Sequence, residues 1–313
     1  DSSTKQANTH EGFHFLALTL QRAQAASGES GELLYSWRIA LKEPANSHYQ
    51  PCNISASTGP LVRRSTEPTS PSSAAGGHTH SSIVDLLQEI VDWLQQQEAF
   101  GMNCILELFV PVEWLDFRWS SLQLRDNRRS ISSVVPLHGL IPYVLRSWER
   151  LEHRQYRSVR AQLEAKYRCL SRGEGSWLAG PEACQTAQLS AAENDASRVG
   201  IKRLRPLENE RDQRIAWLES MLLTMAPVAL WPLPDRPRRT PSKLLGYLNR
   251  YGECLAGHNT GDPVAGDCRR LEALPLHRKA IADDPLVHDI ALLFDHPERA
   301  PAAAVDQAPI LSF

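Results

Sequence analysis

Residues 82–110 read SIVDLLQEIVDWLQQQEAFGMNCILELFV, and this stretch decides the fold class. Its first part repeats apolar residues at intervals of three and four, which predicts an amphipathic helix that begins at Ser82 and ends at Gly101. The run from Cys104 to Val110 is apolar except for Glu107 and predicts a short strand buried on both faces. A helix, a short loop and a buried strand in that order are typical of a sheet with helices packed on it.

Shorter patterns on both sides of this stretch extend the prediction. Apolar and polar residues alternate over 13–20 and 33–42, which predicts an N-terminal β-hairpin. The other predicted strands are 118–124, 141–146, 228–231 and 290–294. The other predicted helices are 155–171, 215–225, one that opens at Pro241, and 275–283. The sequence therefore predicts an α/β (or α+β) fold, a mixed sheet with an N-terminal β-hairpin, helices packed on it and long loop insertions.

Composition divides the chain into segments. We expect residues 1–42 to form the N-terminal β-hairpin of the main domain, and residues 43–80, which are rich in Pro and Ser, to form a flexible loop. Residues 81–301 complete one α/β domain, and residues 302–313 form a tail. Within the domain, residues 172–200 are rich in Gly, Ser and Ala without a clear period, so we expect an irregular insertion there.

Charge and composition exclude several classes of function. The 313 residues include 34 Lys and Arg against 36 Asp and Glu, and a net charge of -2 provides no general attraction to nucleic acid or to an anionic membrane. No apolar run reaches the roughly 20 residues that a membrane-spanning helix needs. Six cysteines in a chain of this length do not indicate a disulfide scaffold, which favours a reducing, cytoplasmic compartment. The common nucleotide-binding and hydrolase motifs do not occur, and no cofactor is expected.

Glu107 is the charged residue of the predicted strand 104–110. A buried carboxylate costs free energy unless it is paired, and Arg146 and Arg150, near the end of another predicted strand, are its candidate partners. Two interpretations stay open at this point. We favour a structural ion pair, and the alternative is a site carboxylate with a raised pKa.

Asp295 and His296 follow the last predicted strand directly. In open α/β sheets, ligands bind beyond the carboxyl ends of strands, which makes this pair the best candidate for a site. The alternative is that Asp295 caps the turn that begins at Pro297. A hydrolase would use Glu107, Asp295 and His296 as its catalytic residues, and it requires the three side chains to meet within hydrogen-bond reach in a concave pocket.

Two further sets of residues are weighed as binding sites. Cys254, His258 and Cys268 have the residue types of a zinc site, but they include no closely spaced cysteine pair and no evident fourth ligand, so no metal is expected. Three basic clusters are candidates for nucleic-acid binding, although solvated surfaces or partner contacts are favoured in a chain of this net charge. They are Arg125, Arg128 and Arg129; Lys202, Arg203 and Arg205; and Arg236, Arg238 and Arg239.

Three stretches together resemble the C-terminal domain of vWA-MoxR-associated proteins. They are LELFVPVEWL at 106–115, VLRSWERL at 144–151 and LLFDHPERAP at 292–301. Their order and spacing are similar to those of the family over residues 13–301. Phe294 stands where the family usually has tryptophan, and His296 where a second acidic residue is expected, which argues against a metal site built on an acidic pair.

The resemblance implies a component of a bacterial conflict, or antiphage, system. The partners that it implies are proteins: a MoxR-type AAA+ ATPase, a von Willebrand A (vWA) protein, or a trypsin-like protease effector. The implied role is sensing or adaptor signalling without catalysis, and the resemblance supplies no catalytic residues. We expect Arg146, Arg150, Asp295 and Arg299 to form the polar centre of the binding region.

Overall fold

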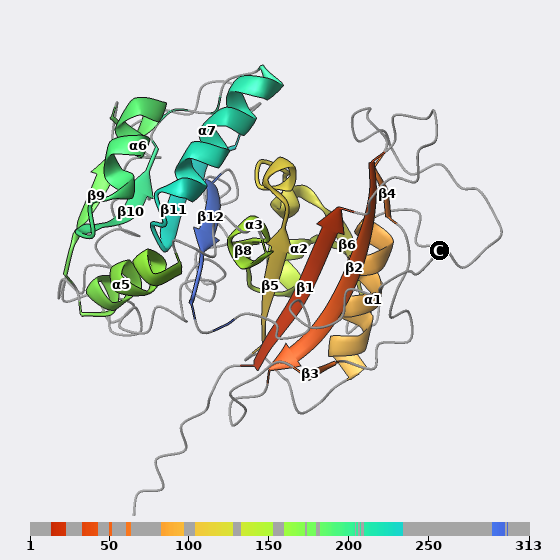
Figure 1. The fold of residues 1–313 in the computed structure, drawn as a ribbon. Coiled ribbons are helices and arrows are strands. Elements are labelled where there is room, and N and C mark those ends of the chain that lie inside the picture. Colours follow the sequence, from red (N-terminus) through yellow and green to blue (C-terminus); the bar gives the residue numbers. More distant parts are fainter. Residues whose placement is uncertain are drawn as a thin grey trace, which may run out of the picture.

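The computed structural model describes residues 14–22, 33–42, 50–51, 61–63, 83–96, 104–127, 133–152, 160–172, 174–179, 182–203, 205, 207, 210–233, 290–297 and 299. The strands of its main sheet are β1 (His14–Arg22), β2 (Leu33–Lys42), β3 (Gln50–Pro51), β4 (Leu61–Arg63), β5 (Cys104–Val110), β8 (Tyr143–Ser147), β9 (Ser176–Ala179), β10 (Arg198–Lys202), β11 (Val228–Pro232) and β12 (Ile290–Phe294). Across the described part of the sheet the order is β3-β2-β1-β5-β8-β12-β11-β10-β9, with β4 paired to β2 (Figure 1). The predicted fold class, a mixed sheet that carries helices, is confirmed.

The sheet contains two parallel blocks that run in opposite directions. β1 and β2 form the predicted antiparallel hairpin, in which Leu20 lies opposite Trp37. β1, β5, β8 and β12 run parallel to one another. β12 is antiparallel to β11, and β11, β10 and β9 again run parallel. As a result, the carboxyl ends of β5, β8 and β12 lie at one edge of the sheet.

The central strands are apolar because both of their faces are covered. Every residue of β5, β8, β11 and β12 is buried, which is the usual environment of continuous apolar runs. Alternate side chains of β5 enter two different hydrophobic clusters: Leu106 and Leu108 join the larger one, and Ile105 and Phe109 the smaller one. The predictions at 141–146, 228–231 and 290–294 correspond to β8, β11 and β12.

Helices accompany the sheet in two groups (Figure 1). α1 (Ile83–Gln96) lies beside β1 and β2, whereas α5 (Arg160–Ser171), α6 (Thr186–Glu193) and α7 (Arg211–Leu223) lie beside β9 to β12. The apolar stripe predicted for α1 is buried along its whole length, because that face packs into the larger cluster. Its members are Ile83, Leu86, Leu87, Ile90, Val91 and Leu94.

The expectation of an irregular insertion at 172–200 is wrong. This segment contains β9, a short 3-10 helix at Glu182–Cys184, α6 and part of β10. Its periodicity is weak because the elements are short and depend on small residues. A Cβ added to Gly200 of β10 would stand 2.5 Å from Cε3 of Trp177, so glycine leaves room for this side chain of β9.

Two other expectations change in detail. Within 43–80, which was expected to be a loop, β3 and β4 are short strands because both pair with β2, a contact that local composition does not encode. Residues 118–124 begin with a 3-10 helix at Trp119–Ser121 rather than a strand. β6 (Gln123–Asp126) follows it and pairs with β7 (Ser133–Pro136) in a separate two-stranded sheet. The tail at 302–313, the helix predicted to open at Pro241 and the helix predicted at 275–283 lie outside the described residues.

Candidate functional site

The candidate site residues meet at the carboxyl ends of three neighbouring parallel strands. Leu108 of β5, Leu145 of β8 and Leu293 of β12 are in register across the sheet. Arg146 comes directly after Leu145, and Asp295 comes two residues after Leu293. The short helix α3 (Glu149–Glu152) follows β8 and brings Arg150 to the same edge.

Arg146 is at the centre of the site, and only 1% of its side chain is exposed. Its Nη1 donates a hydrogen bond to Glu107 Oε1 at 2.7 Å, and its Nε lies 3.3 Å from Asp295 Oδ1. Its Nη2 donates to the backbone carbonyls of His296 at 2.7 Å and Arg299 at 2.9 Å. Of the two candidate partners of Glu107, the structure therefore pairs it with Arg146.

Arg150 pairs with Asp295 instead. Its Nη1 donates to Asp295 Oδ2 at 2.7 Å and to the carbonyl of Ala226 at 2.9 Å. Its Nε and Nη2 both donate to the carbonyl of Leu222, at 3.0 and 2.8 Å. The last carbonyls of a helix have no partner within the helix, and Arg150 satisfies those at the end of α7.

Asp295 connects the segment after β12 to β8 and α3. Besides its two arginine partners, its Oδ1 accepts a hydrogen bond from the backbone N–H of Ser147 at 3.1 Å. Its own backbone N–H donates to the carbonyl of Pro227 at 2.8 Å. The carboxylate of Asp295 therefore contacts β8 and α3. The alternative interpretation of the sequence was that Asp295 caps the turn that begins at Pro297.

Arg299 is the third arginine near the two carboxylates, Glu107 and Asp295. Its Nη1 lies 3.5 Å from Glu107 Oε1, and its guanidinium carbon lies 4.1 Å from the centre of the Phe15 ring. The carbonyl dipoles that accept from Arg146 and Arg150 offset the extra positive charge. We call the following five residues the buried arginine cluster: Glu107, Arg146, Arg150, Asp295 and Arg299.

His296 meets this cluster through its backbone rather than as a proton carrier. Its carbonyl accepts from Arg146, and its ring lies against Tyr167 with 4.5 Å between the ring centres. Burial, followed by the charges of Arg299, Arg146 and Lys42, lowers the pKa of His296 from 6.5 to about 2. The imidazole is therefore neutral at physiological pH.

The chemistry available to the cluster follows from its burial. Glu107 is 0%, Asp295 4% and His296 8% exposed. The hydrolase hypothesis requires these three residues to converge in a concave pocket. The structure does bring Glu107 and Asp295 to one guanidinium, that of Arg146, but it covers them, and both carboxylates are engaged by arginines.

The cluster also crosses the shortest ladder of the described sheet. β8 and β12 share a single in-register pair, Leu145 with Leu293, whereas β5 with β8 and β11 with β12 are paired along their lengths. Arg146, Arg150 and Asp295 supply charged bonds at this junction. Removal of one partner of a buried ion pair leaves a charge without its partner, which costs free energy. We therefore expect the ion pairs of Arg146, Arg150 and Asp295 to break together. We call the β8–β12 junction the seam.

Glu149, at the start of α3, changes charge close to neutral pH. Its Oε1 accepts from the backbone N–H of Val112 at 2.7 Å, and its Oε2 accepts from Ser147 Oγ at 3.2 Å. Burial raises the pKa of Glu149 from 4.5 to about 7, although these hydrogen bonds act in the opposite direction. A titrating carboxyl therefore lies two residues from the end of β8.

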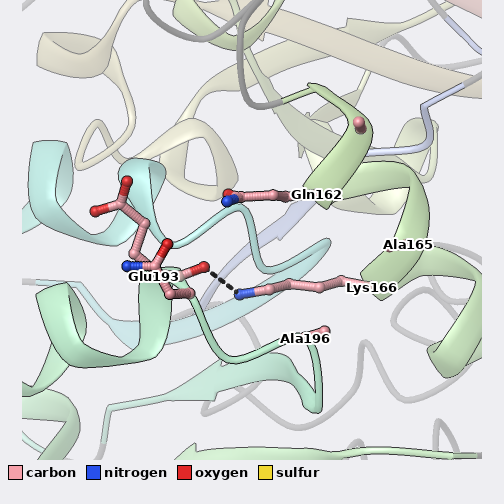
Figure 2. Close-up of a pocket in the computed structure, with 7 residues that line it drawn as sticks. Gln162, Ala165, Lys166, Glu193 and Ala196 are labelled. Atoms are coloured by element: carbon pink, nitrogen blue, oxygen red, sulfur yellow. Dashed lines mark hydrogen bonds between the residues drawn. The ribbon is translucent and has the colours of Figure 1, made fainter.

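A second feature, which sequence reasoning missed, is a pocket of about 220 Å³ between α5 and the end of α6 (Figure 2). We call it the α5–α6 pocket. Its lining residues are Ala161, Gln162, Ala165, Lys166, Glu193, Asn194 and Ala196. Gln162 and Lys166 extend from α5 towards Glu193, and the alanines leave the space between them open (Figure 2).

Lys166 is fully buried beside this pocket. Its Nζ donates to the backbone carbonyls of Ala192 at 2.9 Å, Glu193 at 3.2 Å and Thr224 at 2.6 Å, and it thereby joins the ends of α6 and α7. Burial lowers the pKa of Lys166 from 10.5 to about 8. The signal was present in the sequence, because Lys166 lies three residues after Leu163 on the buried stripe of α5.

The remaining candidates do not assemble into a site within the described residues. Arg203 is buried, and its guanidinium carbon lies 4.8 Å from the centre of the Trp217 ring, so the second basic cluster is not an open patch. Cys254, His258 and Cys268 lie outside the described residues. In the described part, no group of three His, Cys, Asp or Glu side chains is arranged to hold a metal. No helix of that part has the length and apolar character that a membrane span requires.

Comparison with known proteins agrees with the resemblance found in the sequence. The family model described as vWA-MoxR associated protein C-terminal domain matches residues 47–297. The match covers most of the chain and includes Glu107, Arg146 and Asp295. No curated protein and no solved structure matches the chain.

Proposed function

We propose, because the chain belongs to the family of vWA-MoxR associated protein C-terminal domains, that it is a non-catalytic sensing or adaptor module of a bacterial conflict system. In this role the domain binds protein partners in the reducing cytoplasm and passes a signal to them. The partners are a MoxR-type AAA+ ATPase, a vWA protein or a trypsin-like protease effector. The family supports the association with vWA and MoxR proteins, and the adaptor and antiphage roles are the proposal.

The observation that carries the proposal is the internal pairing of the charged candidate residues. An active site keeps its acids and bases within reach of a bound substrate. Here Glu107 and Asp295 are committed to arginines in a buried site, and His296 is held neutral. These groups support a rigid scaffold, which leaves the surface of the domain to contact partners.

Reconstitution tests the proposal. The chain is mixed in turn with a MoxR-type ATPase, a vWA protein and a trypsin-like protease effector, and complex formation is followed by size-exclusion chromatography with light scattering. We expect a complex of defined mass and a change in the rate of ATP hydrolysis when the chain is added. Failure of all three proteins to bind, at micromolar concentrations and at physiological salt, contradicts the adaptor role.

Two assays on the isolated chain test the rival functions. Turnover of ester, peptide or phosphodiester substrates that is lost in Glu107→Gln would replace the adaptor by a hydrolase. Binding to DNA or RNA that weakens steeply with salt would favour a nucleic-acid-binding role through the arginine clusters. The adaptor role expects neither result.

A further inference from the structure

The two-stranded sheet of β6 and β7 has one edge that the chain closes and one that it leaves open. Gln88 of α1 lies along the edge of β6. Its Oε1 accepts a hydrogen bond from the backbone N–H of Arg125 at 2.7 Å, and its Nε2 donates to the carbonyl of Arg125 at 3.1 Å. A side-chain amide thus takes the place of a neighbouring strand. In the part of the chain that the structure describes, no strand pairs with the other edge, that of β7.

The pairing of β6 with β7 shows which backbone groups point to the open edge. Arg125 lies opposite Val134. In an antiparallel pair, opposite residues alternate between those that exchange both hydrogen bonds and those that exchange none. Arg125 uses its N–H and C=O groups with Gln88, so the pair that it forms with Val134 is of the second kind. The N–H and C=O groups of Val134 therefore point away from β6, towards the open edge of β7.

We propose that this edge receives one extended strand of a protein partner, which pairs antiparallel with β7 at Val134 and carries an acidic side chain that reaches Arg125. The inference rests on the proposed function, because it assigns a contact to the partner of an adaptor. When a strand is added to an open sheet edge, main-chain hydrogen bonds give affinity and alternate side chains give specificity. The direction of the backbone groups, the exposed surface and the charge each support this mode of binding.

The exposure of Val134 indicates a contact surface. Its side chain is 63% exposed, and it is the exposed large apolar residue of the described part of the chain. Proteins usually protect an open edge with charged residues, a bulge or a proline. β7 contains no charged residue, and its proline, Pro136, is its last residue. The edge at Val134 therefore keeps its donor, its acceptor and an apolar side chain that an added strand would cover.

Charge determines which strand fits. Arg125 is exposed, and its side chain takes part in none of the ion pairs between described residues. Opposite residues of an antiparallel pair stand on the same face, so the Arg125 side chain lies beside Val134. Asp126 is buried on the other face, where Gln95 donates to it at 3.3 Å. A carboxylate next to Val134 on the exposed face would have to come from the partner strand.

Other occupants fit the edge less well. A helix uses its own N–H and C=O groups internally and cannot pair with those of Val134. A second copy of this chain would bring β7 against β7, and neither copy would then supply a carboxylate for Arg125. Such a contact would also involve four residues from each copy, whereas stable interfaces bury roughly 1,200–2,000 Å² in total. An acidic extended segment satisfies both the backbone groups and Arg125.

Peptide titration tests the edge without any partner. The probe acetyl-Thr-Glu-Thr-Val-Thr-Glu-Thr-amide is added to the full chain labelled with nitrogen-15, and we expect the amide resonances of Val134 and Arg125 to shift with millimolar affinity. Methylation of the central valine nitrogen removes the donor to the Val134 carbonyl and should weaken binding at least about tenfold. Methylation of the two flanking threonine nitrogens, whose N–H groups point away from β7, should leave the affinity unchanged.

Four variants give this experiment its controls. Val134→Pro removes the outward N–H, which edge strands tolerate, and should abolish binding. Val134→Ala keeps both backbone groups and should still distinguish the two methylated peptides. Arg125→Gln keeps the backbone bonds to Gln88 and should remove the preference for the acidic probe over the same peptide with Lys in place of Glu. Gln123→Ala changes an exposed residue of β6 away from the open edge and should leave binding unchanged.

Several results would overturn the proposal. They are equal affinities of the parent and valine-methylated peptides, weaker binding of the threonine-methylated peptide than of the valine-methylated one, no preference for the acidic probe, and no shift at millimolar peptide. Sedimentation of the chain alone gives one more. A dimer that Val134→Pro dissociates would show that a second copy occupies the edge, and it would overturn the assignment to a partner strand.

The same variants separate this proposal from the adaptor role. If a complex with the ATPase, the vWA protein or the protease forms, we expect Val134→Pro to weaken it at least tenfold and Gln123→Ala to leave it intact. Equal complex formation by Val134→Pro would remove the edge proposal but preserve the adaptor role. Absence of any complex would remove the adaptor role, and the peptide titration would still decide whether the edge accepts an acidic strand.

Discussion

Arg146 contacts two carboxylates in a buried site, so its loss removes a partner that both of them share. Met has a similar length and no charge, and in Arg146→Met the buried Glu107 loses its 2.7 Å bond, while Arg299 stays 3.5 Å away. We expect the free energy of unfolding, measured in urea at pH 7.5, to fall by about 3–5 kcal/mol, as for other broken buried pairs.

Two comparisons show whether charge burial causes that loss. Arg198→Met removes an arginine whose side chain is 35% exposed and whose partner Asp195 lies at 3.3 Å, and it should change stability by less than about 1 kcal/mol. Arg146→Lys keeps a positive charge beside Glu107 and Asp295, so it should lose less stability than Arg146→Met. Equal losses in the two variants contradict this explanation.

Glu149 should make the protein more stable in mild acid. The pKa of Glu149 is about 7 in the fold and 4.5 in the unfolded chain, so the folded state binds more protons between these values. Stability that Glu149 contributes below pH 4.5 is therefore lost as the pH rises through 7, by up to about 3 kcal/mol. We expect Glu149→Gln, which mimics the protonated form, to be more stable than the wild type at pH 8. Urea unfolding from pH 5 to 8 measures this, and parallel profiles of the two proteins contradict it.

His296 should make stability depend on pH in the opposite direction to Glu149. Its pKa is about 2 in the fold and 6.5 in the unfolded chain, so acid protonates the unfolded chain first. The stability that neutral His296 contributes above pH 6.5 falls as the pH decreases, by about 2 kcal/mol between pH 7 and 5. His296→Phe keeps a ring beside Tyr167 but does not titrate. We expect the free energy of unfolding of His296→Phe to increase from pH 7 to pH 5, since the contribution of Glu149 is then no longer opposed by that of His296. If the free energy of unfolding of His296→Phe changes with pH as that of the wild type does, the assignment to His296 is contradicted.

At the scale of secondary structure, Lys166 shows how one side chain terminates two helices. The carbonyls at the end of α6 and after α7 need donors, and the Lys166 ammonium supplies three. Lys166→Ala removes the ammonium and leaves a space that opens towards the α5–α6 pocket. We expect this variant to have a lower Tm than the wild type, because buried carbonyls lose their partners.

Chemical rescue distinguishes the lost donors from lost packing. Propylammonium replaces the deleted part of the side chain, and binding to the folded state alone stabilises it. We expect propylammonium chloride at tens of millimolar to raise the Tm of Lys166→Ala and to leave that of the wild type unchanged. Tetramethylammonium chloride, which has no N–H, controls for ionic strength. Equal responses to the two salts contradict the role of the donors.

The elements also show what a sequence can predict. α1 and β5 were predicted because their burial follows from local spacing, which the sequence displays directly. β3, β4, β9 and β10 were missed because neighbouring strands order them, and short runs with Gly and Ser carry little periodicity. Glu107 was identified by the cost of burying it. The main acceptors of Arg150 were not, since they lie at the end of α7 and just after it, more than 70 residues away.

At the scale of the whole molecule, the sheet is continuous but unevenly joined. The half with β1, β2 and β5 meets the half with β9 to β11 through β8 and β12, which share one in-register pair. Backbone ladders lose hydrogen bonds one at a time, whereas a cluster of buried charges opens only when all its members become hydrated. The seam should therefore open as a unit and at a lower free energy than global unfolding.

Hydrogen exchange measured by mass spectrometry tests this expectation on the folded protein. In Arg146→Met we expect faster exchange in peptides from β8, β12 and the end of α7, because these segments carry the bonds of the buried arginine cluster. Peptides from β1 and β2 should keep their wild-type rates, since their long ladder lies away from the seam. Arg198→Met, a substitution of a partly exposed residue within the other half, should change neither group. If exchange in β1 and β2 rises as much as in β8 and β12, the protein opens only by global unfolding, and the seam is not a separate unit.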